Sequence, residues 1–359
     1  MRKTDFRADS VVRILWIILF LALCLIPSVG MLFTGETKPS ANEILSSRPV
    51  LVKRDGSINT AVLDDVTDYI ADRFAFRKKL VTAWAQLNAS LFHSSAERQV
   101  ILGRDGWLYF EPTLNDYMGR SMSEDQLDRA AAYLAALQQE VESRGARFLF
   151  TVAPNKNSLY GEHMPSYIPA DHASSNLERL KPYLMRYGVN YLDLFDVLSA
   201  RDEELYYRGD THWTDRGAAL AADALLAALD KPSAYFAGPF AAGEPHRGDL
   251  YEMLFPTGTE REESAYYVPG FSYELSGDPN GGNALRISSA CSGRDGSLLC
   301  WRDSFGISLY PYLSDSFESA VFLRSSSYDL AEIEKTGADT VLIEIAERNL
   351  PQLSDAGRK

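Results

Sequence analysis

The longest uninterrupted apolar stretch of the chain lies close to its N-terminus. Residues 14–33 carry no charged side chain, and as a helix they would cross a bilayer core of about 30 Å. Basic residues precede the run and favour a cytoplasmic N-terminus: Arg2, Lys3, Arg7 and Arg13. We therefore expect a cytoplasmic end (1–13), a single-pass anchor in the cell membrane (14–33) and an extracytoplasmic remainder. A cleaved signal peptide is the alternative, but no clean cleavage site follows the run.

The section that follows, residues 34–96, changes its pattern partway. Residues 34–60 contain prolines, serines and asparagines with little periodicity, and we expect them to form a stalk. From Asp64 to Ala89, apolar side chains recur at helical spacing, which predicts one amphipathic helix. The positions that set this period are Val66, Ile70, Phe74, Leu80, Trp84 and Leu87.

Residues 97–350 alternate between short apolar runs and amphipathic segments, and we expect them to form the compact domain. It begins with a hairpin over 99–110, in which Asp105 and Gly106 supply the turn. Strands are predicted at 147–153, 189–194, 285–289, 297–301, 320–323 and 339–345, and helices at 123–144, 177–187, 215–229, around 310–313 and at 329–336. This alternation is typical of an α/β fold around a mostly parallel sheet. Residues 232–284 are interpreted as an insertion on the substrate side, and 351–359 as a tail.

Two of the predicted helices carry clear start signals. Ser123 and Gln126 form a capping-box pattern at the start of the first, and Gly145 is a suitable residue just beyond its end. Thr214 is a suitable N-cap for the helix over 215–229.

Charge and cysteine content narrow the classes of partner and compartment. The formal net charge is −13 with no basic block to offset it, so a nucleic-acid partner is not expected. Cys24 lies in the apolar run, whereas Cys291 and Cys300 fall in the exported part, where a disulfide is chemically permitted. A tight turn between them would set the two sulfurs out of register, and a longer loop would restore the pairing. We expect this bridge to form.

Candidate chemistry gathers in three loops placed at the ends of predicted strands, where ligands of open α/β sheets bind. These loops cover 154–157, 209–213 and 302–306. Asp210 and His212 are two residues apart, so in an extended segment both side chains point to one face. Ser304 supplies a hydroxyl that needs an adjacent base to become a nucleophile. Together they predict a triad for acyl transfer, with His212 as base and Asp210 orienting its ring.

The two motifs around these residues resemble a known family. Asp210-Thr-His-Trp-Thr214 followed by Arg302-Asp-Ser-Phe-Gly306 is similar to the SGNH-hydrolase-like domain of the alginate O-acetyltransferase (AlgJ/AlgX) family and its DHHW relatives. Further matches are the segments 103–109, 153–156 and 343–350, so the resemblance covers roughly residues 70–350. It implies a three-layer fold with 97–350 as catalytic domain, O-acetylation of an exported or cell-surface polysaccharide, and an acetyl group supplied by a membrane-embedded acyltransferase.

Four further residues are interpreted as substrate-binding. Asn155 is the candidate for the oxyanion site, and Lys156 either binds a substrate oxygen or stabilises its loop. Trp213 either stacks on a sugar ring or is a buried wedge. Arg302 takes the place of a glycine in the ordinary SGNH motif. Asp303 is expected to be structural, bonding the backbone near Ser304.

Other functions fit parts of the same pattern. One alternative is that Asp210 and His212 only cap and pack the following helix, and another is that they bind a metal. Clustered histidine spacing is missing, and we expect neither a metal nor a cofactor. With water as the acceptor, the same triad would give an acetylesterase. A polysaccharide-binding or assembly protein without catalysis is the alternative from another class. The four remaining histidines are interpreted as surface or structural residues.

Overall fold

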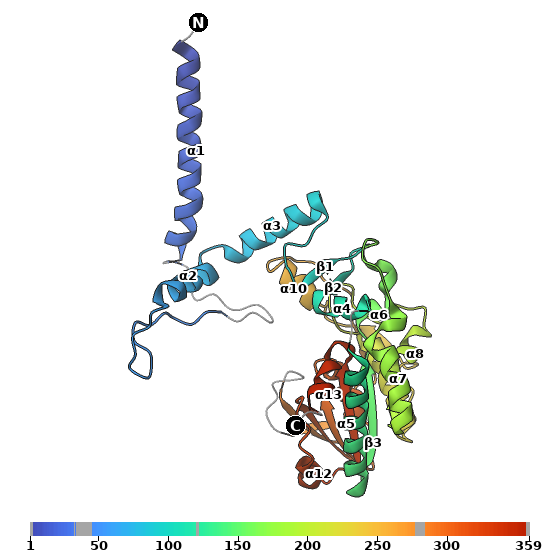
Figure 1. The fold of residues 1–359 in the computed structure, drawn as a ribbon. Coiled ribbons are helices and arrows are strands. Elements are labelled where there is room, and N and C mark those ends of the chain that lie inside the picture. The colour runs from blue at the N-terminus through green and yellow to red at the C-terminus, as the bar shows by residue number, and fades with distance from the viewer. Residues whose placement is uncertain (1–2, 32, 34–44, 120–121, 277–283, 357–359) are drawn as a thin grey trace. The chain divides into compact units, whose positions relative to one another are not determined.

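The computed structural model describes residues 3–31, 33, 45–119, 122–276 and 284–356 (Figure 1). Parts of the predicted anchor, stalk, insertion and tail lie outside the described residues, namely 32, 34–44, 277–283 and 357–359. The chain forms two compact units. One comprises Met1–Glu97 with Tyr251–Thr259, and the other comprises Arg98–Leu250 with Glu260–Lys359. The segment 232–284 therefore contributes to both units.

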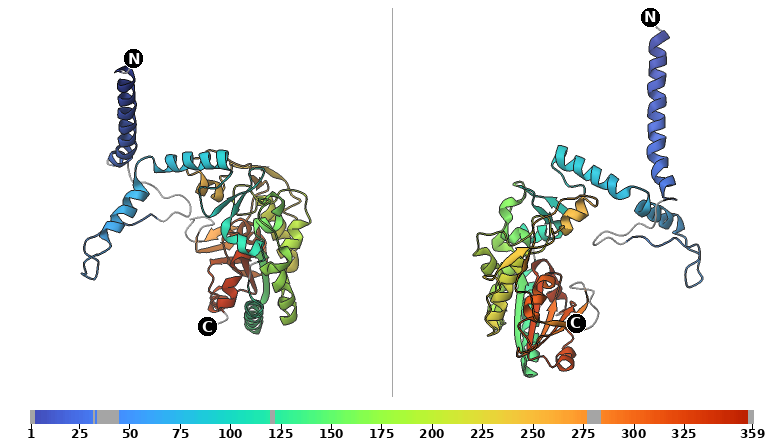
Figure 2. Two further views of the ribbon diagram at one scale, coloured as in Figure 1. Left: turned by 45° about the horizontal axis from the view of Figure 1, so that its top comes forward. Right: turned by 180° about the vertical axis from the view of Figure 1, so that it is seen from behind.

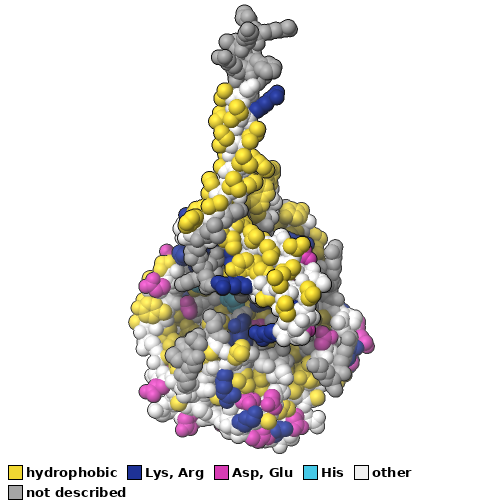
Figure 3. Space-filling model, turned by 90° about the vertical axis from the view of Figure 1, so that its left-hand side faces the viewer, with side chains coloured by type: hydrophobic (Ala, Val, Ile, Leu, Met, Phe, Trp, Pro, Cys, Tyr) yellow, Lys and Arg dark blue, Asp and Glu magenta, His cyan; other side chains and the backbone are white. Residues whose placement is uncertain are grey.

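The first unit contains the apolar N-terminal helix. α1 covers Lys3–Gly30, and its stretch Ser10–Pro27 is long and apolar enough to cross a membrane. Pro27 lies inside this helix rather than at its end. Figure 3 shows the column of apolar side chains that the described part of α1 presents.

The prediction of one amphipathic helix over 64–89 is wrong in one respect, because the structure has two helices there. α2 covers Val62–Arg73 and α3 covers Arg77–Phe92. Between them Phe76 has a φ of 65°, in the left-handed region that a continuous helix cannot contain. The apolar period continues through the break, so periodicity alone did not reveal it.

The second unit is built around one mixed sheet (Figures 1 and 2). In the described part of the chain the strand order is β4-β3-β11-β9-β10-β8-β7. The strands from β4 to β10 pair in parallel, whereas β8 and β7 are antiparallel additions at one edge. The strand bounds are β3 Arg147–Ala153, β4 Tyr191–Leu192, β7 Glu274–Ser276, β8 Arg286–Ala290, β9 Ser297–Arg302, β10 Ser319–Arg324 and β11 Thr340–Ala346.

Helices cover both faces of this sheet. One face carries α5 (Glu124–Ser143), α7 (Asn176–Tyr187), α12 (Ala331–Thr336) and α13 (Pro351–Ala356); the other carries α8 (Leu194–Ser199), α9 (Asp215–Ala228) and α11 (Gly306–Ser314). Side chains of β11 alternate between the two cores, with Leu342 in one and Val341 and Ile343 in the other. A parallel strand buried on both faces requires this continuous apolar run. The predicted three-layer α/β fold is confirmed.

Shorter elements complete the described part of the chain. They are β1 Val100–Leu102, β2 Leu108–Phe110, α4 Leu114–Tyr117, α6 Lys156–Leu159, β5 Phe240–Ala242, α10 Asp249–Leu254 and β6 Ala265–Tyr267. β1 and β2 form the predicted hairpin, and its turn residues Asp105 and Gly106 both have positive φ. The capping box at Ser123 and the N-cap at Thr214 are confirmed as well.

The predicted disulfide between Cys291 and Cys300 is wrong. Both thiols are free and buried. Cys300 lies on β9 and Cys291 directly follows β8, and β10 pairs between these two strands. The prediction assumed that the strands before and after the intervening turn pair with each other, whereas the chain inserts a later strand between them.

Candidate active site

Ser304 lies where the sequence predicted it, in the loop that joins β9 to α11. Asp303 fixes this loop to the neighbouring strand. Its Oδ1 accepts a hydrogen bond from the Phe305 N–H at 2.9 Å, and its Oδ2 accepts one from the Ala346 N–H at 2.6 Å. The structural role expected for Asp303 is confirmed. Gly306 permits a close approach, because a Cβ there would lie 2.5 Å from Arg302 Cδ.

Asp210 and His212 come from a different kind of loop than predicted. Residues 209–213 follow no strand of the sheet and lie between α8 and α9, in a turn closed by a bridge between Tyr206 and Trp213. Thr214 then accepts the Gly217 N–H at 3.2 Å and begins α9. The helix start therefore fixes where the loop ends, and the bridge fixes its width.

Ser304, His212 and Asp210 form one line of hydrogen bonds. His212 Nε2 lies 2.8 Å from Ser304 Oγ, and His212 Nδ1 lies 2.7 Å from Asp210 Oδ1. Because a carboxylate only accepts, Nδ1 carries the proton and Nε2 is left to accept from the serine hydroxyl. Burial would raise the pKa of Asp210, but hydrogen bonds from His212 and His246 outweigh burial and hold it well below its usual value. The imidazole of His212 is thus hydrogen-bonded to a carboxylate whose charged form is favoured.

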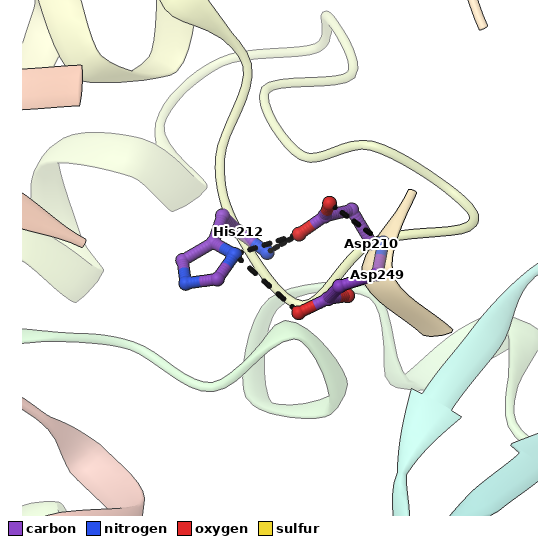
Figure 4. A group of neighbouring side chains, drawn as sticks. All are labelled: Asp210, His212 and Asp249. Atoms are coloured by element: carbon purple, nitrogen blue, oxygen red, sulfur yellow. Dashed lines mark hydrogen bonds and ion pairs between the residues drawn. The ribbon is translucent and has the colours of Figure 1, made fainter. Parts of the chain in front are cut away.

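Two residues that the sequence left without a role complete the surroundings of Asp210. His246 Nε2 lies 2.8 Å from Asp210 Oδ2, and the Asp249 N–H donates to the same oxygen at 2.9 Å. Asp249 also accepts from the N–H and the hydroxyl of Thr211, at 2.8 and 2.7 Å. Figure 4 shows the carboxylates of Asp210 and Asp249 on the same side of His212, facing Nδ1. Both oxygens of Asp210 are therefore fixed in position.

The segment that carries His246 and Asp249 packs directly on the loop of Asp210 and His212. A Cβ on Gly248 would lie 2.1 Å from the carbonyl oxygen of Gly209, so only glycine fits there. Glu262, which forms a bridge with His246, accepts the N–H groups of Arg208 and Gly209 at 2.6 and 2.8 Å. In the sequence, the glycine of the run Gly248-Asp249-Leu250 could have indicated a close backbone contact. The sequence does not show which segment that contact is made with.

Lys156 also stabilises this loop. Its ammonium donates to the carbonyl oxygens of Tyr207, Arg208 and Asp210 at 3.0, 2.7 and 2.5 Å. Burial lowers the pKa of Lys156 to about 7, against the pull of nearby carboxylates such as Asp210. These contacts use all three protons of the ammonium, so the loop-stabilising alternative describes Lys156 and a direct substrate contact does not.

Trp213 and Arg302 are also buried and cannot present a surface to a sugar. The indole of Trp213 is 1% exposed and meets Phe305 edge-on, with ring centroids 4.9 Å apart. The guanidinium of Arg302 donates to the carbonyl oxygens of Asp303 and Ala284, both at 2.9 Å. The expectation that they bind substrate is thus corrected. Both hold the loop of Ser304 in place, since Trp213 reaches it through Phe305 and Arg302 through Asp303.

Asn155 differs from these three residues. Its backbone N–H donates to Glu347 Oε2 at 2.7 Å, but within the described chain neither its side-chain oxygen nor its nitrogen has a hydrogen-bond partner. It lines a cavity with Thr211 and Arg348 that holds about one water molecule. An unpaired buried amide is costly unless something binds it. Asn155 follows β3 and Ser304 follows β9, and β11 lies between these two strands. Neighbouring strands of a sheet are about 5 Å apart.

Asp210, His212 and Asp249 also have the spacing of a metal site, since their ligand atoms lie within 4.8 Å of one another. Each carboxylate oxygen that faces His212 already accepts a hydrogen bond, from His212 or from Thr211. An ion would have to displace these donors. The arrangement is therefore better suited to orienting an imidazole than to holding a metal.

Comparison with known proteins adds to this geometry. The family described as "SGNH hydrolase-like domain, acetyltransferase AlgX" matches residues 100–282, which include Asp210 and His212 and end before Ser304. The "Probable alginate O-acetylase AlgJ" of Pseudomonas aeruginosa is 30% identical over 189 residues, 50% of this chain and 47% of that protein. The protein of the same name from Pseudomonas syringae pv. tomato is 28% identical over 192 residues, 51% and 48% of the two chains. The chain spans about half the length of the curated relatives it matches.

Solved structures share the fold of the second unit. A DHHW family protein from Eubacterium siraeum has a TM-score of 0.54 at 18% identity and covers 72% of this chain and 94% of that one. PatB1 from Bacillus cereus also has a TM-score of 0.54 at 18% identity, with 70% and 96% covered. The O-acetyltransferase domain of Pseudomonas putida AlgJ has a TM-score of 0.50 at 16% identity, with 72% and 99% covered.

Proposed function

Because the chain belongs to the family of SGNH hydrolase-like acetyltransferases of the AlgX type, we propose that it moves an acetyl group onto a hydroxyl of an exported or cell-surface polysaccharide. The observation that carries the proposal is the contact of 2.8 Å between His212 Nε2 and Ser304 Oγ. The relatives named as probable alginate O-acetylases support an alginate-like acceptor.

In the first half of the reaction, Ser304 Oγ attacks the carbonyl carbon of an acetyl ester while His212 Nε2 takes the hydroxyl proton. Asp210 stabilises the imidazolium that forms. The tetrahedral intermediate collapses, the bond to the donor oxygen breaks, and His212 returns its proton to that oxygen. Acetyl-serine remains on the enzyme.

In the second half, His212 removes the proton of the acceptor hydroxyl, whose oxygen attacks the acetyl-serine carbonyl. The Ser304 ester bond then breaks, and Ser304 regains its proton from His212. The product is an acetylated sugar and the free enzyme. Asn155, whose side chain is unpaired, is the residue we assign to a polar group of the bound substrate.

The acetyl donor and the location of the enzyme belong to the same proposal. α1 is assigned as an uncleaved anchor, with the second unit outside the cytoplasm. The donor must cross or reach the membrane to meet Ser304, so a membrane-embedded acyltransferase is the partner expected to supply it.

The test uses the purified full-length chain, a chromogenic acetyl ester and a uronate oligosaccharide. We expect acetylated oligosaccharide by mass spectrometry, and an S304A variant that loses at least about 10³-fold in rate with an unchanged Tm. Ser308→Ala, in the first turn of α11, is the matched control and should keep its activity. Transfer that persists in S304A would exclude the triad.

One observation favours hydrolysis as the second candidate. The His212 side chain is 25% exposed, so water can reach the base. An acetylesterase would release acetate at a rate that the oligosaccharide does not change, and no acetylated sugar would appear.

A further inference from the structure

Helix α3 presents a continuous apolar stripe to solvent. Leu80, Trp84, Leu87 and Leu91 are separated by four, three and four positions, so they share one face of the helix. Each is between 43% and 64% exposed. A soluble protein rarely leaves such a row of large side chains uncovered without a partner for it.

The opposite face of α3 is the one that packs within the first unit. Thr82 and Ala85 are buried there. Thr257 donates its backbone N–H to Thr82 Oγ1 at 3.0 Å, which fixes this face against the segment Tyr251–Thr259. The exposed stripe therefore lies on the face of α3 that points away from this contact.

The start of α3 has a charge pattern that is unfavourable in water. Arg77, Lys78 and Lys79 form its first turn, which contains no acidic residue. The N-terminus of a helix carries a partial positive charge, so cations there destabilise it and anions stabilise it. The chain as a whole is acidic, with a net charge of −13, which makes this basic turn stand out. The charge of this turn is complementary to an anionic layer beside α3.

Contacts within the first unit bring the start of α3 next to the outer end of the predicted anchor. The Ala75 N–H donates to the carbonyl oxygen of Pro27 at 3.1 Å. A Cβ on Gly30 would lie 2.7 Å from the Ala75 Cβ, so the last turn of α1 packs closely on the residues that precede α3. A chain whose α1 crosses the bilayer thus begins α3 at the membrane surface.

We propose that α3 lies in the interface of the leaflet where α1 ends, with its apolar stripe among the lipid tails and its basic first turn among anionic headgroups. Leu and Trp side chains beside Lys and Arg are the composition of interfacial helices, and Trp prefers the headgroup level. The inference depends on α1 as an anchor and not on the chemistry of Ser304.

The experiment uses the full-length chain with Trp16→Phe, reconstituted in lipid nanodiscs that contain phosphatidylglycerol. Trp107, Trp213 and Trp301 are at most 1% exposed, so in this variant Trp84 is the tryptophan that lipid can reach. Lipids brominated near the headgroup should quench most of the Trp84 fluorescence. A further Trp84→Phe change should remove the quenchable component.

The paired variant L80S/L91S should lose this quenching, whereas Met185→Ser, which changes an exposed apolar residue of α7, should keep it. Replacing phosphatidylglycerol by phosphatidylcholine, or Lys79 by Glu, should reduce the quenching.

Trp84 that stays unquenched by lipid and open to aqueous iodide would overturn the proposal. So would shielding that appears only at high chain concentration or only after a membrane acyltransferase is added, because a protein would then cover the stripe. A chain that does not float with vesicles would refute the anchor and this proposal together, whatever its acetyltransferase activity.

Discussion

The loops around Ser304 and the surface of α3 depart from the usual distribution of side chains in opposite directions. The first region buries Lys156, Asp210 and Glu347, and the second exposes Leu80 and Trp84. These buried polar groups have partners inside the chain, such as the three carbonyl oxygens around Lys156. The exposed stripe has its partner, in our proposal, outside the chain. Departures from local rules are expected at functional sites, and their partners indicate which kind of function each serves.

The largest effect should follow from breaking the polar cluster at Lys156. Lys156→Met takes the ammonium away from three carbonyl oxygens, of which that of Arg208 still accepts the Leu108 N–H, and should cost about 3 kcal/mol in the free energy of unfolding. Because the same loop carries Asp210, the acetyl-ester rate should also fall about 100-fold. Chemical denaturation and steady-state rates measure the two effects. Lys335→Met, which removes an exposed ion pair with Glu332, should change either by little. Equal losses in both variants would contradict the comparison.

A second test concerns the buried carboxyl pair behind the Asn155 loop. Burial, and then the charge of Asp116, raise the pKa of Glu347 to about 8. The unfolded chain releases this proton near pH 4.5, so the stability contribution is lost as pH rises from there to about 8. Glu347→Gln removes the titration and should make the protein about 2 kcal/mol more stable than the wild type at pH 9. Thermal unfolding at pH 5 should show little difference, and a gain of the same size at both pH values would exclude this cause.

A smaller effect is expected for His246, which reaches Ser304 only through Asp210 and His212. His246→Ala should lower the acetyl-ester rate about tenfold through kcat, and His246→Gln, which keeps an N–H donor, should recover most of it. Burial lowers the pKa of His246, but the Asp210 carboxylate outweighs it and raises the pKa above the usual value. The stabilisation is therefore present below the usual histidine pKa and disappears as pH rises through the raised one. The Tm difference between wild type and His246→Ala should shrink from pH 6 to pH 9.

The smallest effect should come from the exposed region in the absence of lipid. In detergent-free buffer or mild detergent, Leu80→Ser should change the free energy of unfolding by no more than about 0.5 kcal/mol. Leu225→Ser, at a fully buried position of α9, should cost at least about 3 kcal/mol. A large loss for Leu80→Ser would mean that the stripe packs within the protein, and the contrast between the two regions would disappear.

Much of the second unit was predictable because its signals are local. Continuous apolar runs predicted β3 and β11, and side-chain chemistry predicted the caps at Ser123 and Thr214. The break at Phe76 was not predictable, because the apolar period runs through it. The disulfide failed because strand order is not local. β10 comes after β9 in the chain but pairs on the side towards β8, and this separates Cys291 from Cys300.

The sequence by itself indicated the candidate groups for the proposed reaction, since Ser304, His212 and Asp210 combine a hydroxyl, a base and an acid within recognisable motifs. Tertiary structure alone decided their surroundings. It brought His246 and Asp249 to the second oxygen of Asp210, and it buried Trp213 and Arg302 behind the serine loop. The physical reason is that reactivity belongs to side chains and can be read residue by residue. Burial and hydrogen-bond partners depend instead on contacts between segments far apart in the chain, which only packing establishes.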